Sequence, residues 1–241
     1  MIPLYDEANA TRGNPPFATW AIVAITSVVF LWQLGIGDEA LQTFVGMRGV
    51  SPAKFLNEHS LLSFSSAAWT LLSYQFLHGD LLHLAGNMLF LWVFGDNIED
   101  AMGAIRFVSF YLLCGVAGAG AHIASDPGSV TPLIGASGAV AGVLTAYLIV
   151  RPCAKVTVLF YGVHTVDAYL AIGAWLCYQV VGLTQPSDVA YWAHLGGACA
   201  GALLMILLRP TGVRLFDCVR AQEPPSTAVS ADSSIPRSNS A

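Results

Sequence analysis

Six apolar segments, separated by more polar stretches, run along this chain of 241 residues. A helix needs about 20 residues, within a range of about 17 to 25, to cross the hydrocarbon core of a bilayer. The second segment is short of a full span unless Asn97 and Ile98 are included, and the fifth has the least defined boundaries. The segments are residues 17–35, 81–95, 104–124, 133–150, 168–183 and 189–208. This pattern predicts an all-α membrane protein with six transmembrane helices.

Two stretches between the segments mix polar and apolar residues. Residues 38–75 contain Arg48, Lys54 and short apolar runs, so we interpret them as amphipathic structure that lies in the membrane interface. An interfacial position is also one interpretation of residues 156–161. After Glu223 the chain is rich in Pro, Ser and Ala without apolar periodicity, which predicts a disordered tail.

Composition agrees with a membrane protein and limits the classes of binding partner. Hydrophobic residues make up 55% of the chain and charged residues 10%, and the mean hydropathy is +0.63. An average soluble domain has about 25% charged residues. The net charge of -5 is small and dispersed, so it indicates neither a nucleic-acid partner nor an acidic one. The lipid bilayer is the partner that composition predicts.

The five cysteines are odd in number, scattered, and mostly inside or beside apolar segments. They suggest neither a disulfide framework nor a CxxC metal pair, and we expect them to be small residues that fill the core. They are Cys114, Cys153, Cys177, Cys199 and Cys218.

Positive charges predict how the chain is oriented. With six spans, eight of the ten Lys and Arg residues fall on one side of the membrane, and Arg48 and Lys54 fall on the other. Because positive residues accumulate on the cytoplasmic side, both termini are expected there. The first residues match neither a signal peptide nor a transit peptide, which favours a bacterial plasma membrane. The expected organisation is a cytoplasmic N-terminus (1–16), a membrane domain (17–208) and a cytoplasmic tail (209–241).

Four polar side chains in the spans are expected at one depth. In this topology the second, fourth and sixth spans start outside, and His83, Ser137 and His194 lie two, four and five residues after the predicted starts. At about 1.5 Å per residue, all three lie within roughly 10 Å of the helix starts. Asn87 shares a helix face with His83. Polar residues inside a membrane usually mark function, although hydrogen bonds between helices are the structural alternative.

Glycines could bring the fourth and sixth spans together. Gly138 and Gly142 are four residues apart, as are Gly197 and Gly201, and His194 lies on the face of the second pair. Small residues at this spacing let membrane helices pack closely, so a serine between glycines, taken alone, fits packing better than catalysis. Contact between the two glycine stripes would nevertheless bring the serine to the histidine.

These residue types together suit acyl transfer. A serine hydroxyl becomes a good nucleophile when a base such as a neutral imidazole accepts its proton. Ser137 is the candidate nucleophile and His194 the candidate base. No Asp or Glu is predicted at this depth to orient the imidazole, so we predict a dyad. Asn87, His83 and the backbone N–H of Ser137 are candidate donors to the oxyanion.

Three motifs together resemble the rhomboid family of intramembrane serine proteases, and the resemblance extends over residues 17–208. They are the nucleophile motif Gly135-Ala136-Ser137-Gly138, the base Ala193-His194 with the glycines that follow it, and the oxyanion-side pattern His78-x4-His83-x3-Asn87. Residues 95–103 also resemble the family's turn after the second span, in which Glu99 would be structural. A tyrosine that stacks on the base in some members is replaced by Ala141.

The resemblance implies a bundle of six helices around a water-filled cavity that opens to the outside. It implies a first loop that lies in the membrane and a fifth span that acts as a lateral gate. It further implies cleavage of single-span membrane proteins at small residues near the outer face, with no cofactor and no metal. The residues that would support the site are His78, Gly135, Gly138, Gly197 and Gly201.

Two alternatives belong to other functional classes. His78, Asp80 and His83 could bind a metal, as in a transporter or a membrane metalloenzyme. A non-catalytic rhomboid-like chaperone would bind transmembrane segments and would be expected to lack the serine or the base. A soluble hydrolase is disfavoured because its serine would follow a strand, whereas this serine opens an apolar run. On residue type alone, Glu99 and Asp100 are interpreted as solvated loop charges.

Overall fold

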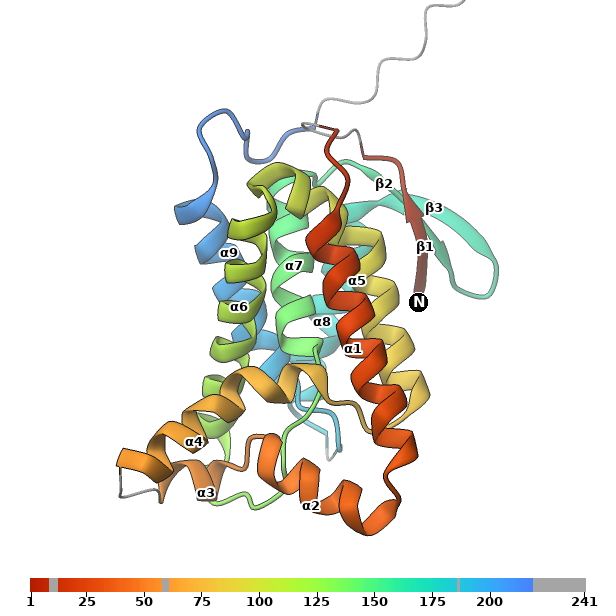
Figure 1. Ribbon diagram of the computed structural model, residues 1–241. Helices are drawn as coiled ribbons and strands as arrows, with labels where there is room; N and C mark the ends of the chain where they lie inside the picture. Colours follow the sequence, from red (N-terminus) through yellow and green to blue (C-terminus); the bar gives the residue numbers. More distant parts are fainter. Residues whose placement is uncertain (9–12, 58–60, 186, 219–241) are drawn as a thin grey trace, which may run out of the picture.

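The computed structural model describes residues 1–8, 13–57, 61–185 and 187–218. In chain order its elements are β1 (Ile2–Asp6), α1 (Phe17–Gly35), α2 (Asp38–Arg48), α3 (Pro52–Leu56), α4 (Leu61–Ser73), the short 3-10 helix η1 (Tyr74–Phe76), α5 (Leu81–Met102), α6 (Ala104–Ser125), α7 (Ser137–Val150), β2 (Lys155–Leu159), β3 (Val163–Asp167), α8 (Ala168–Gly182) and α9 (Tyr191–Leu208). Figure 1 shows the long helices side by side in a bundle, with α2, α3 and α4 across one end.

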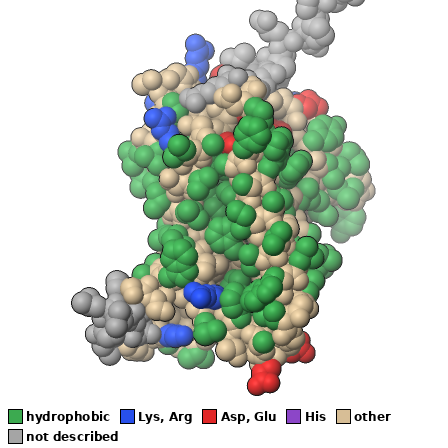
Figure 2. Space-filling view, viewed as in Figure 1, with side chains coloured by type: hydrophobic (Ala, Val, Ile, Leu, Met, Phe, Trp, Pro, Cys, Tyr) green, Lys and Arg blue, Asp and Glu red, His purple; other side chains and the backbone are tan. Residues whose placement is uncertain are grey.

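The bundle helices correspond to the six apolar segments of the sequence. Within the described part of the chain, α1, α5, α6 and α9 are long and apolar enough to cross a membrane, and α7 and α8 are shorter apolar helices. Figure 2 shows hydrophobic side chains over the middle of one face, with charged side chains gathered toward its two ends. The chain is therefore a multi-pass membrane protein.

Two helix boundaries differ from the prediction by more than two residues. The fourth apolar segment was expected to be helical from Leu133, but α7 begins at Ser137. Leu133 is extended, because its backbone N–H donates to the carbonyl of Val50 (2.8 Å) and its carbonyl accepts from the N–H of Val50 (3.0 Å). Helix α5 runs past the predicted end to Met102, and it stops at Gly103, which has a φ of 86°.

The all-α prediction is wrong in one respect, because the chain also contains a sheet. Strands β1, β2 and β3 form an antiparallel sheet in the order β1-β2-β3. Residues 156–161 therefore belong to β2 and the turn after it. The sequence pattern did not reveal this, because a strand of five residues carries little periodicity and β1 pairs with residues far along the chain. Asp6 connects β1 to the bundle, since it accepts hydrogen bonds from Tyr147 Oη (2.5 Å) and Asn97 Nδ2 (3.0 Å).

The described residues between α1 and η1 form the short helices α2, α3 and α4. The predicted amphipathic character of residues 38–75 stays a prediction, as does their position in the membrane interface.

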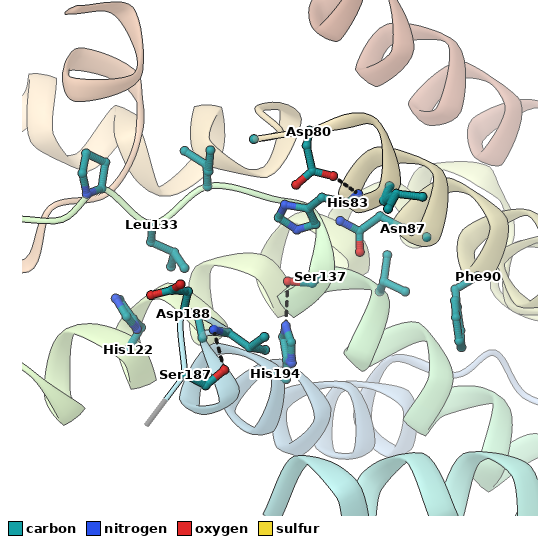
Figure 3. Close-up of a pocket in the computed structure, with 18 of the residues that line it drawn as sticks. Asp80, His83, Asn87, Phe90, His122, Leu133, Ser137, Ser187, Asp188 and His194 are labelled. Atoms are coloured by element: carbon teal, nitrogen blue, oxygen red, sulfur yellow. Dashed lines mark hydrogen bonds between the residues drawn. The ribbon is translucent and has the colours of Figure 1, made fainter. Parts of the chain in front are cut away.

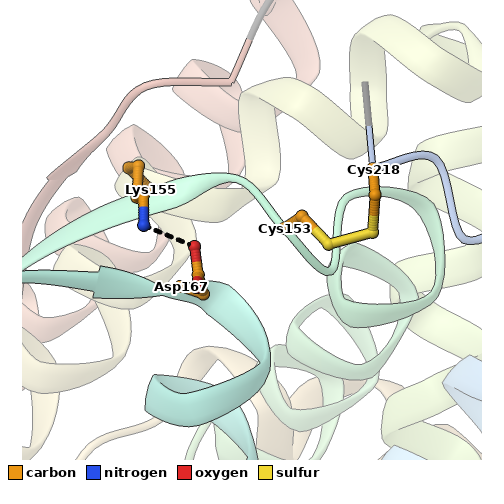
Figure 4. Close-up of a disulfide and its surroundings, with 4 residues drawn as sticks. All are labelled: Cys153, Lys155, Asp167 and Cys218. Carbon is orange, nitrogen blue, oxygen red and sulfur yellow. Dashed lines mark ion pairs between the residues drawn. A yellow bond between two sulfur atoms is a disulfide. The ribbon is translucent and has the colours of Figure 1, made fainter. Parts of the chain in front are cut away.

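The cysteine prediction is wrong for four of the five residues. Cys153 and Cys218 form a disulfide with their Cα atoms 4.9 Å apart (Figure 4). Cys114 is buried, as expected, whereas Cys177 and Cys199 are free and exposed. The paired cysteines are 65 residues apart, so only the folding of the chain brings them together.

The segment after α9 is partly described. Its described portion, residues 209–218, returns to the bundle, where Arg151 and Asp217 form an ion pair with a nitrogen–oxygen distance of 3.7 Å. The predicted disordered tail lies outside the described residues from position 219 onward.

The interpretation of Glu99 and Asp100 as solvated charges is wrong, because both are buried. The carboxylate of Glu99 accepts hydrogen bonds from the backbone N–H groups of Ala18 (2.8 Å) and Thr19 (2.7 Å) and from Thr19 Oγ1 (2.8 Å). The first N–H groups of a helix have no acceptor within the helix, and a negative charge there is favourable. Glu99 thus holds the start of α1 against α5, which agrees with the structural role implied by the resemblance.

Candidate active site

Ser137 is the first residue of α7, and the backbone before it is shaped by Gly135. Gly135 has a φ of +120°, and a Cβ there would lie 2.7 Å from the ring of His83. Only glycine satisfies both conditions without strain. The N–H of Gly135 donates to the carbonyl of Tyr74 (3.0 Å), which fixes this approach against η1. The N–H of Ser137 belongs to the first turn of α7, where backbone donors have no intrahelical acceptor.

Glycines set the separation of α7 and α9, as the sequence predicted. A Cβ at Gly197 would lie 1.9 Å from the carbonyl oxygen of Gly138, and one at Gly201 would lie 2.3 Å from that of Gly142. The two backbones are therefore in direct contact, with no side chain between them. Close packing of this kind is the usual result of small residues at four-residue spacing.

This packing brings the candidate nucleophile and base together. His194 is in the first turn of α9, and its Nε2 lies 2.8 Å from Ser137 Oγ (Figure 3). That distance is within hydrogen-bond range. The serine and the histidine are 57 residues apart in sequence.

Helix α5 contributes the polar groups on the other side of Ser137. Figure 3 shows His83 and Asn87 facing Ser137 from the side opposite to His194. Asn87 Nδ2 lies 2.9 Å from Nε2 of His78, and the N–H of Ala136 donates to the same nitrogen at 3.5 Å. Burial lowers the pKa of His78 to about 4, so its ring is neutral at pH 7, and the two N–H donors share the single lone pair of Nε2, with Asn87 Nδ2 the nearer donor. His78 thereby orients the amide of Asn87.

Asp80 has a structural role at the start of α5. Its Oδ1 accepts a hydrogen bond from the backbone N–H of His83 (2.8 Å), which caps the helix. Among the residues that the structure describes, no group of three or more His, Cys, Asp and Glu side chains is placed to hold a metal ion.

The converging side chains line a cavity of about 900 Å³. Its volume falls within the range of about 300–1,000 Å³ found for ligand pockets. Apolar side chains from three helices form much of the wall, and the candidate catalytic groups provide convergent polar atoms. The lining includes Phe90 of α5, Leu144 of α7 and Trp175 of α8, together with Ser137 and His194.

The other imidazole nitrogen has a partner that residue types and spacing did not predict. Nδ1 of His194 lies 2.7 Å from Oε1 of Gln179 on α8. The ring also has aromatic neighbours, with centroids 6.0 Å away for Trp175 and 6.3 Å away for Tyr191. These groups surround the imidazole in a protein that has Ala141 at the position where the resemblance implies a tyrosine in some members. Gln179 is an amide and not the carboxylate expected beside a catalytic histidine, although a polar residue in an apolar segment is itself a signal.

The known proteins that are similar to this chain point to one family. The model of the Rhomboid domain matches residues 65–211 of this chain. Rhomboid protein 1, mitochondrial, from Saccharomyces cerevisiae is 29% identical over 200 residues, which cover 80% of this chain and 53% of the yeast protein. The mouse presenilin-associated rhomboid-like protein, mitochondrial, is 32% identical over 75% of this chain and 45% of its own length.

A bacterial relative is also similar. Rhomboid protease GluP from Bacillus subtilis is 34% identical over 145 residues, which cover 60% of this chain and 26% of the relative. The chain thus spans about half, or less, of the length of these relatives.

Proposed function

This chain belongs to the rhomboid family, and we propose that it is an intramembrane serine protease whose catalytic dyad is Ser137 and His194. One observation carries the proposal: Ser137 Oγ and His194 Nε2 lie 2.8 Å apart at the wall of a cavity of about 900 Å³. The relative from Bacillus subtilis is named a protease, which supports the same activity.

In the proposed mechanism, Ser137 Oγ attacks the carbonyl carbon of the scissile peptide while His194 Nε2 takes the hydroxyl proton. The protonated imidazole then gives that proton to the leaving amine, and an acyl-enzyme remains. Water, activated by the same imidazole, hydrolyses the ester and regenerates the serine.

The oxyanion of the tetrahedral intermediate would lie between α5 and the start of α7. Asn87 Nδ2, the His83 ring and the N–H of Ser137 are the proposed donors. A donor aimed at the oxyanion contributes about 10²–10³ in rate. The position of Ser137 at the N-terminus of α7 adds the favourable end of the helix dipole.

The proposed substrates are single-span membrane proteins, cut at small residues near the outer face. The proposal includes six spans, formed by α1, α5, α6, α7, α8 and α9, with α8 as the lateral gate. It places residues 1–16 and 209–241 in the cytoplasm, around a membrane domain of residues 17–208. A bacterial plasma membrane stays our prediction of location, whereas the yeast and mouse relatives are mitochondrial by name.

The test is cleavage of a single-span reporter by purified protein in liposomes. We expect the unmodified protein to cut the reporter, and Ser137→Ala and His194→Ala each to abolish cleavage. Ser109→Ala is the matched control, because Ser109 is exposed on α6 and bonds only its own helix backbone in the described structure.

A chelator added to the unmodified protein distinguishes the remaining alternatives. Undiminished cleavage is expected, since the dyad needs no metal. If Ser137→Ala cuts as fast as the unmodified protein, the dyad is refuted, and loss of that cleavage with the chelator would indicate a metal site. Absence of cleavage by every form would favour a protein that binds transmembrane segments without cutting them.

A further inference from the structure

Gln179 is a buried polar residue on α8, and the residues on either side of it in the sequence are exposed. Its side chain is 2% exposed, whereas Tyr178 is 61% and Val180 is 55% exposed. A polar side chain inside a membrane protein is costly and usually has a defined partner. For Gln179 that partner is the imidazole of His194.

Two hydrogen bonds fix which end of the Gln179 amide faces the imidazole. Its Nε2 donates to the backbone carbonyl of Trp175 at 3.2 Å. The opposite orientation would place two oxygen atoms against each other there. Oε1 therefore faces His194 Nδ1, at 2.7 Å.

This orientation determines the tautomer of the base. A carbonyl oxygen can only accept, so His194 Nδ1 must carry the proton. A neutral imidazole protonated at Nδ1 has its lone pair on Nε2, and that nitrogen faces Ser137 Oγ at 2.8 Å. The lone pair is then positioned to accept the hydroxyl proton. In the other tautomer, Nε2 would already carry a hydrogen and could not act as a base.

We propose that Gln179 is a positioning residue that holds His194 in its catalytic tautomer, so that Ser137, His194 and Gln179 act as a triad with a neutral third member. This inference rests on the proposed protease function. In the Ser-His-Asp triads of soluble enzymes the third position is a carboxylate that also stabilises the imidazolium. An amide supplies the acceptor without placing a charge within the membrane, where a charge is expensive.

The position of Gln179 on α8 also links the base to a second helix. Ser137 is on α7, His194 on α9 and Gln179 on α8, so the chain of hydrogen bonds crosses three helices. A displacement of α8 would remove the acceptor from Nδ1 and release the ring.

The first test compares Gln179→Met, which keeps the length of the side chain but removes the acceptor, with Gln179→Glu, which keeps an acceptor. A wrongly held tautomer lowers kcat by about 10⁴ in a soluble triad. We expect Gln179→Met to lower kcat by about 10²-fold with little change in KM, because a neutral amide contributes orientation without charge. Gln185→Met is the matched control, since Gln185 is exposed beyond the end of α8.

The second test is the pH profile of the Gln179→Glu protein. We expect it to retain most of its kcat, and the acidic limb of the profile to move to higher pH because a carboxylate stabilises the imidazolium. An unshifted limb would show that the side chain at position 179 does not contact the imidazole. The rate at which a fluorophosphonate probe labels Ser137 should follow kcat in all variants, because the probe reports serine activation without substrate binding.

The outcomes separate this inference from the function it rests on. If the unmodified protein cleaves and Gln179→Met does so equally fast, the positioning role is overturned and the protease stands. The role is also overturned if Gln179→Glu cleaves with an unshifted profile. If Gln179→Met fails to fold, the Gln179→Glu profile decides. If the unmodified protein neither cleaves nor is labelled, the protease and the positioning role both fall.

Discussion

Replacing Gly197 by alanine should separate the two helices that carry the dyad. The new Cβ would lie 1.9 Å from the carbonyl oxygen of Gly138 and 3.1 Å from its Cα. Both atoms are backbone, so no side chain can turn aside. An ordinary carbon–oxygen contact begins at about 3.3 Å, so α9 must move from α7 by about 1.4 Å.

That displacement is large compared with the tolerance of the site. Gly197 is one turn after His194, so the imidazole would move with it, and the 2.8 Å distance to Ser137 Oγ would approach about 4 Å, outside hydrogen-bond range. A misplacement of about 1 Å can lower catalysis about 10²-fold. Overpacking of a core typically costs about 1–3 kcal/mol. We therefore expect kcat/KM to fall about 10²-fold, with a smaller free energy of unfolding.

The assay is reporter cleavage in liposomes, together with unfolding of the same protein in detergent. Gly120→Ala on α6 is the control, because a Cβ there meets nothing within 4 Å. It should leave both the cleavage rate and the stability near those of the unmodified protein. If Gly197→Ala cleaves at the unmodified rate with unchanged stability, the argument that backbone contact sets the dyad distance is refuted.

Three further predictions concern the end of the molecule near the termini. Glu99→Ala leaves the backbone N–H groups of Ala18 and Thr19 without their acceptor. Each hydrogen bond to a charged group contributes about 1.5–3 kcal/mol, so we expect the free energy of unfolding, measured in detergent, to fall by about 3 kcal/mol. Unchanged stability would contradict this. Burial raises the pKa of Asp6, so its contribution to the docking of β1 is complete below the usual value of 3.8 and is lost as the pH rises through the raised value. Hydrogen exchange of the β1 amides, corrected for intrinsic rates, should therefore slow as the pH falls, and Asp6→Asn should remove that dependence. Disulfides are rare in reducing compartments, so the Cys153–Cys218 disulfide and the predicted cytoplasmic position of this end oppose each other. Reaction of both cysteines with an alkylating reagent in unreduced cells would support the predicted orientation, and protection until reduction would contradict it.

The class of the protein and the convergence of its polar groups could be predicted from residue order. Apolar segments identified the bundle helices, because a helix that crosses the hydrocarbon core needs a long run of apolar side chains. The constant rise of a helix then placed His83, Ser137 and His194 near the starts of alternate spans. Glycine spacing indicated which helices approach, since the absence of a side chain is visible in the sequence.

Other features depend on contacts between segments that are distant along the chain. Ile2 of β1 pairs with Leu159 of β2, and Cys153 meets Cys218, which is 65 positions further along the chain. Neither pairing leaves a periodic local signal. Glu99 carries the same charge whether it faces solvent or the start of α1, so residue type alone could not assign its burial.

Gln179, the third member of the candidate triad, shows most clearly what the sequence determines and what the packing of the helices determines. The sequence places Gln179 in an apolar segment, where a polar group needs a partner, but it does not say which partner. The rotation of α8 about its axis and its packing beside α9 decide that Oε1 meets His194 Nδ1 at 2.7 Å. The depth of a residue in the membrane can be predicted by counting residues along one helix, whereas which side chains face each other depends on how several helices pack.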